Sequence, residues 1–163
     1  MNLELFKKDI LSIYNDLLEK NVVRKLGIVD HDIFQERLVQ LGTKYNLEVE
    51  TEYCGVPFYD NESEKRKRGR IDVVYFQNKN PLIALEIDSG LKKSSVKKLV
   101  VNKKFQHRIW FCYKRKMDMG KYLELIKTYD KKNELIYLLP EKKATYEQIV
   151  KEKSKWDIQN QYQ

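Results

Sequence analysis

The chain has 163 residues, of which 42% are hydrophobic and 34% charged, with a formal net charge of +8 at pH 7. This composition excludes a disordered chain and suffices for one domain with a buried core. No apolar run approaches the roughly 18 residues of a transmembrane helix, and the first residues lack the pattern of a signal peptide. With only two cysteines and two histidines, all far apart, we expect a reduced cytoplasmic protein without a zinc site or membrane contact.

Positive charge is concentrated in two stretches of the chain. Between Asp88 and Asp118 there is no acidic residue, but there are ten Lys or Arg residues. A second basic run extends from Lys65 to Arg70. Clustered positive charge of this kind suits a polyanionic partner, although a lysine-rich solvated surface would give the same composition.

The first half of the chain predicts two helices and a strand. Apolar residues recur at helical spacing over residues 2–20, and a second helix is expected from Asp30, a good N-cap, to about Tyr45. Residues 47–54 alternate between polar and apolar side chains, which is typical of a strand with one polar face. The charged stretch over residues 56–70 is expected to form a loop or hairpin.

The second half predicts an alternation of strands and helices. We expect strands at residues 71–76, 82–88, 107–114 and 133–140, with helices at 92–105, 118–130 and 145–156. The strand, helix and strand within residues 82–113 should form a right-handed crossover with parallel strands. The predicted class is α/β with a mixed central sheet flanked by helices. A single domain over 1–163 would comprise an N-terminal helical extension (1–29), a core (30–140) and a C-terminal helix (141–163).

Three carboxylates stand inside strands that are otherwise apolar. Asp72 belongs to one strand, and Glu86 and Asp88 to the next. Glu86 and Asp88 should share a face, roughly 7 Å apart, and Asp72 reaches the same place if the strands pair. Carboxylates that close need a cation, and Mg²⁺ or Mn²⁺ prefers such oxygen ligands. The alternative is that Asp72 ends an edge strand and Asp88 caps the next helix, but an acid as deep as Glu86 seldom serves stability.

The stretch "GRIDVVYF…IALEID" resembles the motif of the PD-(D/E)xK nucleases, in which an Asp at a strand start precedes a strand ending in Glu-x-Lys and a helix. Asp72 and Glu86 match its two acids, and residues 32–53 resemble the first helix and strand of the same core. The similarity covers roughly residues 30–140. It implies a restriction-endonuclease-like core and Mg²⁺- or Mn²⁺-dependent hydrolysis of DNA phosphodiester bonds. The implied metal ligands are Asp72, Glu86, Asp88 and the carbonyl of Ile87.

This sequence departs from the family motif at two positions. Asp88 stands where the motif has its lysine, so the positive charge must come from elsewhere. At about 100° per residue, Lys93, Lys97 and Lys104 form one stripe on the following helix, and Lys97 is preferred to Lys93 as a relocated catalytic lysine. Glu36 would match the family's helix glutamate, although it lies off the apolar stripe. Glu52 is an alternative additional ligand.

The basic residues are expected to contact phosphates of the substrate, which can be duplex, branched or single-stranded DNA. The expected phosphate contacts are Lys65, Arg66, Lys67, Arg68, Arg70, Lys93, Lys97 and Lys104. An alternative is a catalytically inactive module of the same fold that binds nucleic acid or a protein partner. The first helix, from Leu3 to Leu18, could also pack on a partner or on a second copy in a homodimer.

Overall fold

The computed structural model describes residues 1–20, 23–24, 28–60, 65–113 and 117–140. The C-terminal helix expected within residues 141–163 lies outside these ranges. The helices are α1 (Leu3–Glu19), α2 (His31–Lys44), α3 (Lys93–Val101) and α4 (Met119–Tyr129). The strands are β1 (Val23–Arg24), β2 (Ile28–Val29), β3 (Glu48–Asp60), β4 (Lys65–Gln77), β5 (Asn80–Asp88), β6 (His107–Cys112) and β7 (Ile136–Leu138).

Five strands form a mixed sheet in the order β3-β4-β5-β6-β7. The pairs from β3 to β5 are antiparallel, and β5, β6 and β7 run parallel. These pairings confirm the predicted α/β class with a mixed sheet, and they confirm that β5 and β6 are parallel strands joined by a helix. The short hairpin of β1 and β2, between α1 and α2, was not expected from the sequence.

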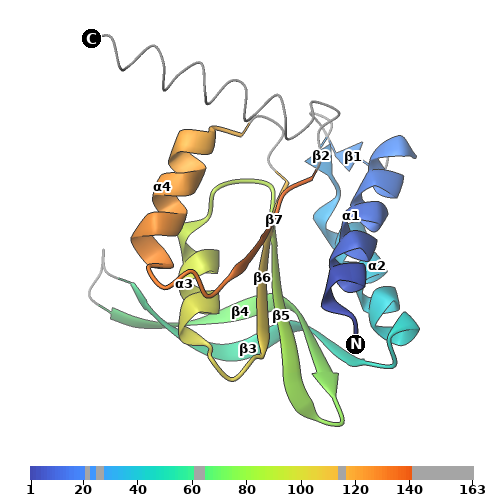
Figure 1. Ribbon diagram of the computed structural model, residues 1–163, viewed down its shortest axis with the longest axis horizontal. Helices are drawn as coiled ribbons and strands as arrows, with labels where there is room; N and C mark the ends of the chain where they lie inside the picture. Colours follow the sequence, from blue (N-terminus) through green and yellow to red (C-terminus); the bar gives the residue numbers. More distant parts are fainter. Residues whose placement is uncertain (21–22, 25–27, 61–64, 114–116, 141–163) are drawn as a thin grey trace.

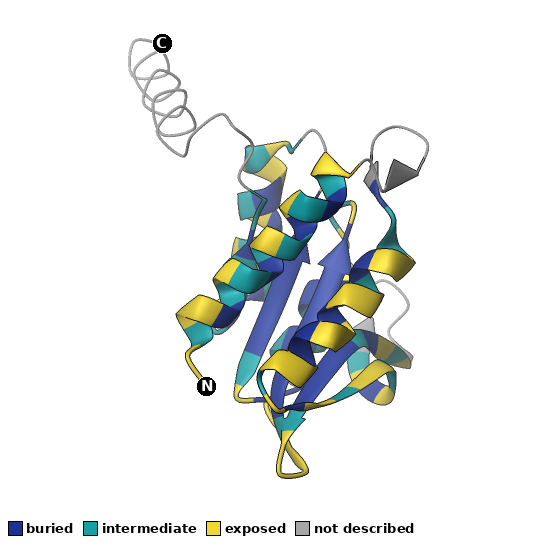
Figure 2. Ribbon diagram, turned by 90° about the vertical axis from the view of Figure 1, so that its right-hand side faces the viewer, coloured by how far each residue is buried: buried dark blue, intermediate teal, exposed yellow. Residues whose placement is uncertain are grey.

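Helices cover both faces of the sheet (Figure 1). α1 and α2 lie on one face, with their buried sides turned to the strands (Figure 2), and α3 and α4 lie on the other. The period-2 pattern of β5 serves both layers: Ile83, Leu85 and Ile87 belong to the core under α1 and α2, whereas Ala84 packs in the core under α3 and α4. Within residues 1–20, 23–24, 28–60, 65–113 and 117–140, no helix is long and apolar enough to cross a bilayer.

The charged stretch expected to be a loop or hairpin is a hairpin that extends the sheet. β3 and β4 have 13 residues each and pair from Glu48↔Phe76 as far as Asp60↔Lys65. β4 pairs with β5 over a shorter length that ends at Val73↔Leu85. Beyond that pair, β4 and β3 turn away from β5 (Figure 1). We call this place the β4–β5 fork; it leaves the last residues of β5 without a ladder partner on β4.

The glycine of α2 allows a close approach of this helix to β3. A Cβ atom at Gly42 would lie 2.1 Å from Val49 Cγ2 and 3.4 Å from the Leu47 carbonyl oxygen. We therefore expect Gly42→Ala to lower the free energy of unfolding by about 1–3 kcal/mol, because overpacking outweighs the better helix propensity of alanine. Urea unfolding measures the change.

Gly120→Ala is the matched control, because this glycine of α4 is exposed. A Cβ atom there would meet only the exposed side chain of Asp118, with Oδ1 at 3.3 Å, which is a much milder contact than at Gly42. Its stability should be equal to or above that of the unchanged protein. Adding Val49→Ala to Gly42→Ala should recover part of the loss by removing the methyl group that clashes. Wild-type stability of Gly42→Ala would contradict the close packing.

Candidate active site

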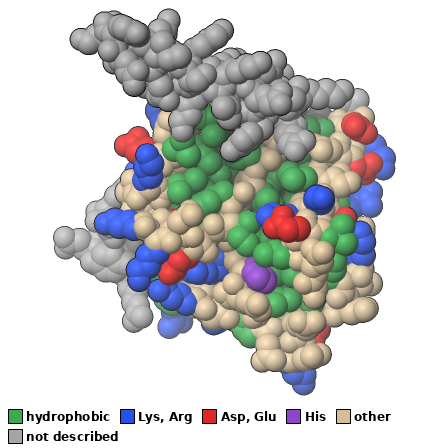
Figure 3. All heavy atoms as spheres, viewed as in Figure 1, with side chains coloured by type: hydrophobic (Ala, Val, Ile, Leu, Met, Phe, Trp, Pro, Cys, Tyr) green, Lys and Arg blue, Asp and Glu red, His purple; other side chains and the backbone are tan. Residues whose placement is uncertain are grey.

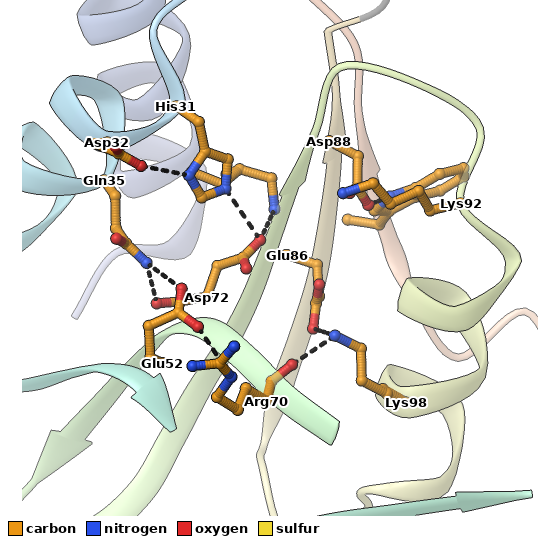
Figure 4. Close-up of polar contacts among 12 residues, drawn as sticks. His31, Asp32, Gln35, Glu52, Arg70, Asp72, Glu86, Asp88, Lys92 and Lys98 are labelled. Carbon is orange, nitrogen blue, oxygen red and sulfur yellow. Dashed lines mark hydrogen bonds and ion pairs between the residues drawn. The ribbon is translucent and has the colours of Figure 1, made fainter. Parts of the chain in front are cut away.

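The three carboxylates predicted to converge lie together at the β4–β5 fork (Figure 4). Asp72 Oδ2 accepts a hydrogen bond from the backbone N–H of Ile87 at 2.8 Å, in place of the strand partner that β5 no longer has. Glu86 and Asp88 are only 2% and 1% exposed, and their carboxyl groups pair with Lys98 on α3 and with Lys92 just before it. Both therefore point to the α3 side of the sheet, as the alternation of the strand predicted.

Glu86 is a buried acid whose main compensating charge is one lysine. Lys98 Nζ lies 2.5 Å from Glu86 Oε1 and also donates to the carbonyl oxygen of Arg70 at 2.5 Å. Apart from this ion pair, Glu86 Oε1 accepts no hydrogen bond of good geometry within the described part of the chain. Burial, reinforced by the negative charge of Asp72, raises the pKa of Glu86 to about 8, while Lys98 opposes the rise.

The lysine beside Glu86 differs from the one that the sequence favoured. Lys97 Nζ lies 4.9 Å from the centre of the Tyr129 ring on α4, and Lys104 follows the end of α3, with its Nζ 2.7 Å from the Tyr53 hydroxyl. Lys93 is exposed at the first residue of α3.

The physical reason is the orientation of α3. Its buried side consists of Ser95, Val96 and Leu99, and is therefore centred near Leu99. Lys98, rather than Lys97, then stands at the border of the buried side next to the fork. A stripe through Lys104 does not exist, because the helix ends at Val101.

Asp88 has partners for both carboxylate oxygens. Its Oδ2 accepts a hydrogen bond from Trp110 Nε1 at 2.8 Å, and its Oδ1 lies 2.9 Å from Lys92 Nζ. It does not cap the following helix, whose N-cap residue is Lys92 without a side-chain cap. Because both oxygens are engaged, the arrangement does not favour Asp88 as a third metal ligand.

Two residues of α2 complete the site, and the sequence pattern did not single them out. His31 Nε2 lies 3.8 Å from Asp72 Oδ2, and this contact is the largest cause of the raised pKa of His31. Gln35 Nε2 donates to the backbone carbonyl of Asp72 at 2.7 Å and to Glu52 Oε1 at 3.2 Å. Glu36, the expected helix glutamate, is exposed. The i, i+4 spacing of His31 and Gln35, beside the buried Phe34, was the available signal.

Glu52 lies beside the site, and its carboxylate contacts Arg70 and Gln35. It adopts a φ of 51°, which is uncommon for a residue other than glycine, near the bulge of β3. Its Oε2 lies 3.3 Å from Arg70 Nε, while Oε1 accepts from Gln35. Glu52 thus connects the β3–β4 hairpin, through Arg70, to helix α2, through Gln35, on the side of the sheet where α2 contacts Asp72.

Of the basic residues expected to contact phosphates, those from Lys65 to Arg70 belong to β4, in the part of the hairpin beyond the fork. Lys and Arg side chains gather on the side of the molecule formed by α3 and the β3–β4 hairpin (Figure 3). Lys67 and Arg68 are exposed and successive on β4, so they project from opposite faces of the strand. Lys65 and Arg66 belong to the same strand. Arg70 lies two residues after Arg68, on the face of β4 that is turned to α2.

A metal ion would have two carboxylate ligands of suitable chemistry here, Asp72 and Glu86. Among the described residues, no group of three or more His, Cys, Asp or Glu side chains is arranged as a metal site. Comparisons with protein-family models, with curated proteins and with solved structures found no match to this chain. The chemistry of the fork therefore rests on its own geometry.

The raised pKa of Glu86 predicts how stability depends on pH. Between about pH 4.5 and 8 the folded state retains a proton that the unfolded state has lost, so stability should fall as pH rises, by at most about 1.4 kcal/mol per pH unit. Glu86→Gln removes this component, and its stability relative to the wild type should rise steadily from pH 5 to pH 8. Urea unfolding with a metal chelator present measures the difference.

Glu124→Gln, which changes an exposed glutamate of α4, is the control and should leave the pH dependence as it is in the wild type. A stability difference between Glu86→Gln and the wild type that is the same at every pH would show that burial does not perturb this carboxyl group.

Proposed function

We propose that the protein is a metal-dependent nuclease that hydrolyses phosphodiester bonds in DNA on a restriction-endonuclease-like core. The observation that carries the proposal is the pair of Asp72 and buried Glu86 at the point where two neighbouring strands diverge, with Lys98 Nζ against Glu86. The order of α2, β3, β4, β5, α3 and β6 supports the proposal, since it is the order that the sequence resemblance implies.

Each residue of the fork has a role in this mechanism. Asp72 and Glu86, with the Ile87 carbonyl, would hold Mg²⁺ or Mn²⁺. An ion bound there would polarise a phosphoryl oxygen and lower the pKa of a bound water. Ile87 N–H and His31 orient the Asp72 carboxylate. Lys98 takes the part of the motif lysine, because its ammonium can offset negative charge that develops on the phosphate beside Glu86.

The substrate backbone would lie along the basic hairpin. Arg68 and Arg70 share one face of β4, and Arg70 is tied through Glu52 and Gln35 to the backbone of Asp72. Phosphates bound along this face would lead to the fork. Such contacts give affinity without sequence preference and make binding dependent on salt.

A second candidate function is a catalytically inactive module of the same architecture that binds nucleic acid. It is favoured by the internal neutralisation of the acids: Asp72 contacts His31, Glu86 contacts Lys98 and Asp88 contacts Lys92. A cluster that carries its own cations can persist without a metal ion. The two functions differ in whether Mn²⁺ binds and whether DNA is cut.

Cleavage of plasmid and branched DNA in Mg²⁺ and in Mn²⁺ tests the enzyme. Lys98→Ala should lower the cleavage rate about a hundredfold or more, the scale for removing one electrostatic interaction from the transition state. Lys97→Ala should cut like the wild type, since its ammonium lies over Tyr129. Glu86→Gln and Asp72→Asn should abolish both cleavage and Mn²⁺ binding measured by calorimetry.

Equal cleavage by Glu86→Gln and the wild type would place the activity elsewhere or assign it to a contaminant. If the wild type cuts no DNA and binds no Mn²⁺, the nuclease proposal fails and the binding module replaces it. A larger defect in Lys97→Ala than in Lys98→Ala would contradict the lysine assignment alone.

The hairpin's role is tested by the salt dependence of DNA affinity. Removing a side chain that binds one phosphate of a duplex should flatten the slope of log K against log salt by roughly 0.9. We expect this change for Arg68→Ala, which lies on the face of β4 shared with Arg70, and none for Lys67→Ala on the opposite face. Lys127→Ala, an exposed lysine in the last turn of α4, is the control. The same slope for Arg68→Ala and Lys127→Ala would exclude Arg68 from the interface.

A further inference from the structure

Asp88 is fixed from inside the protein by a tryptophan. Trp110 is fully buried, and its ring stacks on Tyr122 with centroids 5.4 Å apart and planes at 15°. Its indole N–H has one direction available and donates to Asp88 Oδ2 at 2.8 Å. A side chain clamped in this way holds its second oxygen in a defined place, two residues beyond Glu86 on β5.

The second carboxylate oxygen of Asp88 holds the ammonium of an exposed lysine next to the three carboxylates of Asp72, Glu86 and Asp88. Lys92 Nζ lies 2.9 Å from Asp88 Oδ1, and the Lys92 side chain is 59% exposed, whereas that of Asp88 is 1% exposed. The hydrogen bond with Asp88 is the largest cause of the raised pKa of Lys92, and the charges of Asp88, Asp72 and Glu86 add to it. Figure 4 shows Lys98 reaching Glu86 from α3 and Lys92 reaching Asp88 from the residue just before this helix.

The two lysines can therefore do different things. The Lys98 side chain is 12% exposed, and its ammonium contacts both Glu86 and the Arg70 carbonyl, so two of its three donors are used inside the protein. Lys92 has three N–H donors, and its ammonium pairs with Asp88 Oδ1. The Lys92 side chain is more than half exposed, so its ammonium is accessible to a ligand.

We propose that Asp88 is a positioning residue, and that the Lys92 ammonium it holds contacts a non-bridging phosphate oxygen of nucleic acid bound at the fork. The nature of the ligand rests on the proposed function. Carboxylate charge at the fork disfavours the approach of a phosphate, and the Lys92 ammonium, which is exposed beside the buried Asp88, offsets part of that charge. A lysine is suited to this task as a compact point charge. Asp88, which stands in the place of the motif lysine, thus holds the ammonium of Lys92 at this place.

The first test measures DNA binding in chelator, where no cleavage occurs. Lys92→Ala should flatten the slope of log K against log salt by roughly 0.9 for a duplex. Lys121→Ala is the matched control: it removes a lysine from the first turn of α4 that pairs with Asp118 at 4.0 Å, and the side chains of both residues are exposed. The control should keep the wild-type slope.

A double-mutant comparison tests whether Asp88 acts through Lys92. Asp88→Asn retains an oxygen for the Trp110 hydrogen bond but loses the charge that holds the ammonium. It should flatten the slope as Lys92→Ala does, and the double variant should be no flatter than either single one. If Asp88→Asn does not fold, Lys92→Ala, which changes an exposed side chain, carries the test by itself.

Metal titration separates this role from direct ligation by Asp88. Lys92→Ala should bind Mn²⁺ at least as tightly as the wild type, because it removes a competing positive charge, and yet cut DNA more slowly. A purely structural defect would lower both. If Asp88→Asn weakens Mn²⁺ binding equally with Lys92 present or absent, Asp88 is a metal ligand and the positioning role is overturned.

An unchanged salt slope in Lys92→Ala would overturn the phosphate contact. The nuclease proposal can fail independently. If the wild type cuts no DNA but Lys92→Ala has a flatter slope of log K against log salt, Lys92 contacts phosphate in a protein that binds DNA without cutting it. Conversely, Glu86→Gln could lose cleavage while Lys92→Ala keeps the wild-type salt slope and cleavage rate. In that case the nuclease proposal stands, and Lys92 has no part in its mechanism.

Discussion

The hydrogen bond from Ile87 N–H to Asp72 Oδ2 is the interaction on which the fork depends. When β4 turns away after Val73↔Leu85, the backbone of β5 loses its ladder partner on that side. A buried N–H left unpaired costs about 1–3 kcal/mol, and a carboxylate acceptor offsets that cost with a charge-assisted bond. The same bond brings Asp72 next to Glu86, so that the divergence of the strands and the meeting of the acids have one cause.

Burying Glu86 is unfavourable, and several features of the chain compensate for it. Lys98 reaches across from α3 to neutralise it, and the Arg70 carbonyl holds the ammonium on the other side. Gly69 makes room for this reach, because a Cβ atom there would lie 2.8 Å from Lys98 Cδ and 3.1 Å from Phe58 Cε1. A buried ion pair seldom improves stability over apolar packing, and strongly perturbed acids cluster at functional sites. The energetic cost of this fork therefore favours a chemical or binding role.

The sequence predicted correctly those parts of the site that follow from the alternation of side chains between the two faces of a strand. Alternation along β5 placed Glu86 and Asp88 on one side and Ile83, Leu85 and Ile87 on the other. These three apolar residues lie in the core under α1 and α2, whereas the two acids pair with Lys98 and Lys92 on the α3 side. The parallel pairing of β5 with β6 followed from the intervening helix, because two parallel neighbours need a crossover. Local patterns sufficed here, since strand geometry leaves a side chain only two directions.

The parts that the sequence left open depend on how elements meet. Which of Lys97 and Lys98 reaches Glu86 is decided by the rotation of α3 about its axis, and that rotation is set by the packing of Leu99 and Ser95 on the sheet. His31 and Gln35 enter the site because α2 crosses β4 near Asp72.

The sequence by itself determined the α/β class, the inward acids and the basic run, because composition and periodicity act within one element. Only the tertiary structure decided which cations meet those acids, because charges at separate places in the chain become partners only when helices and strands pack.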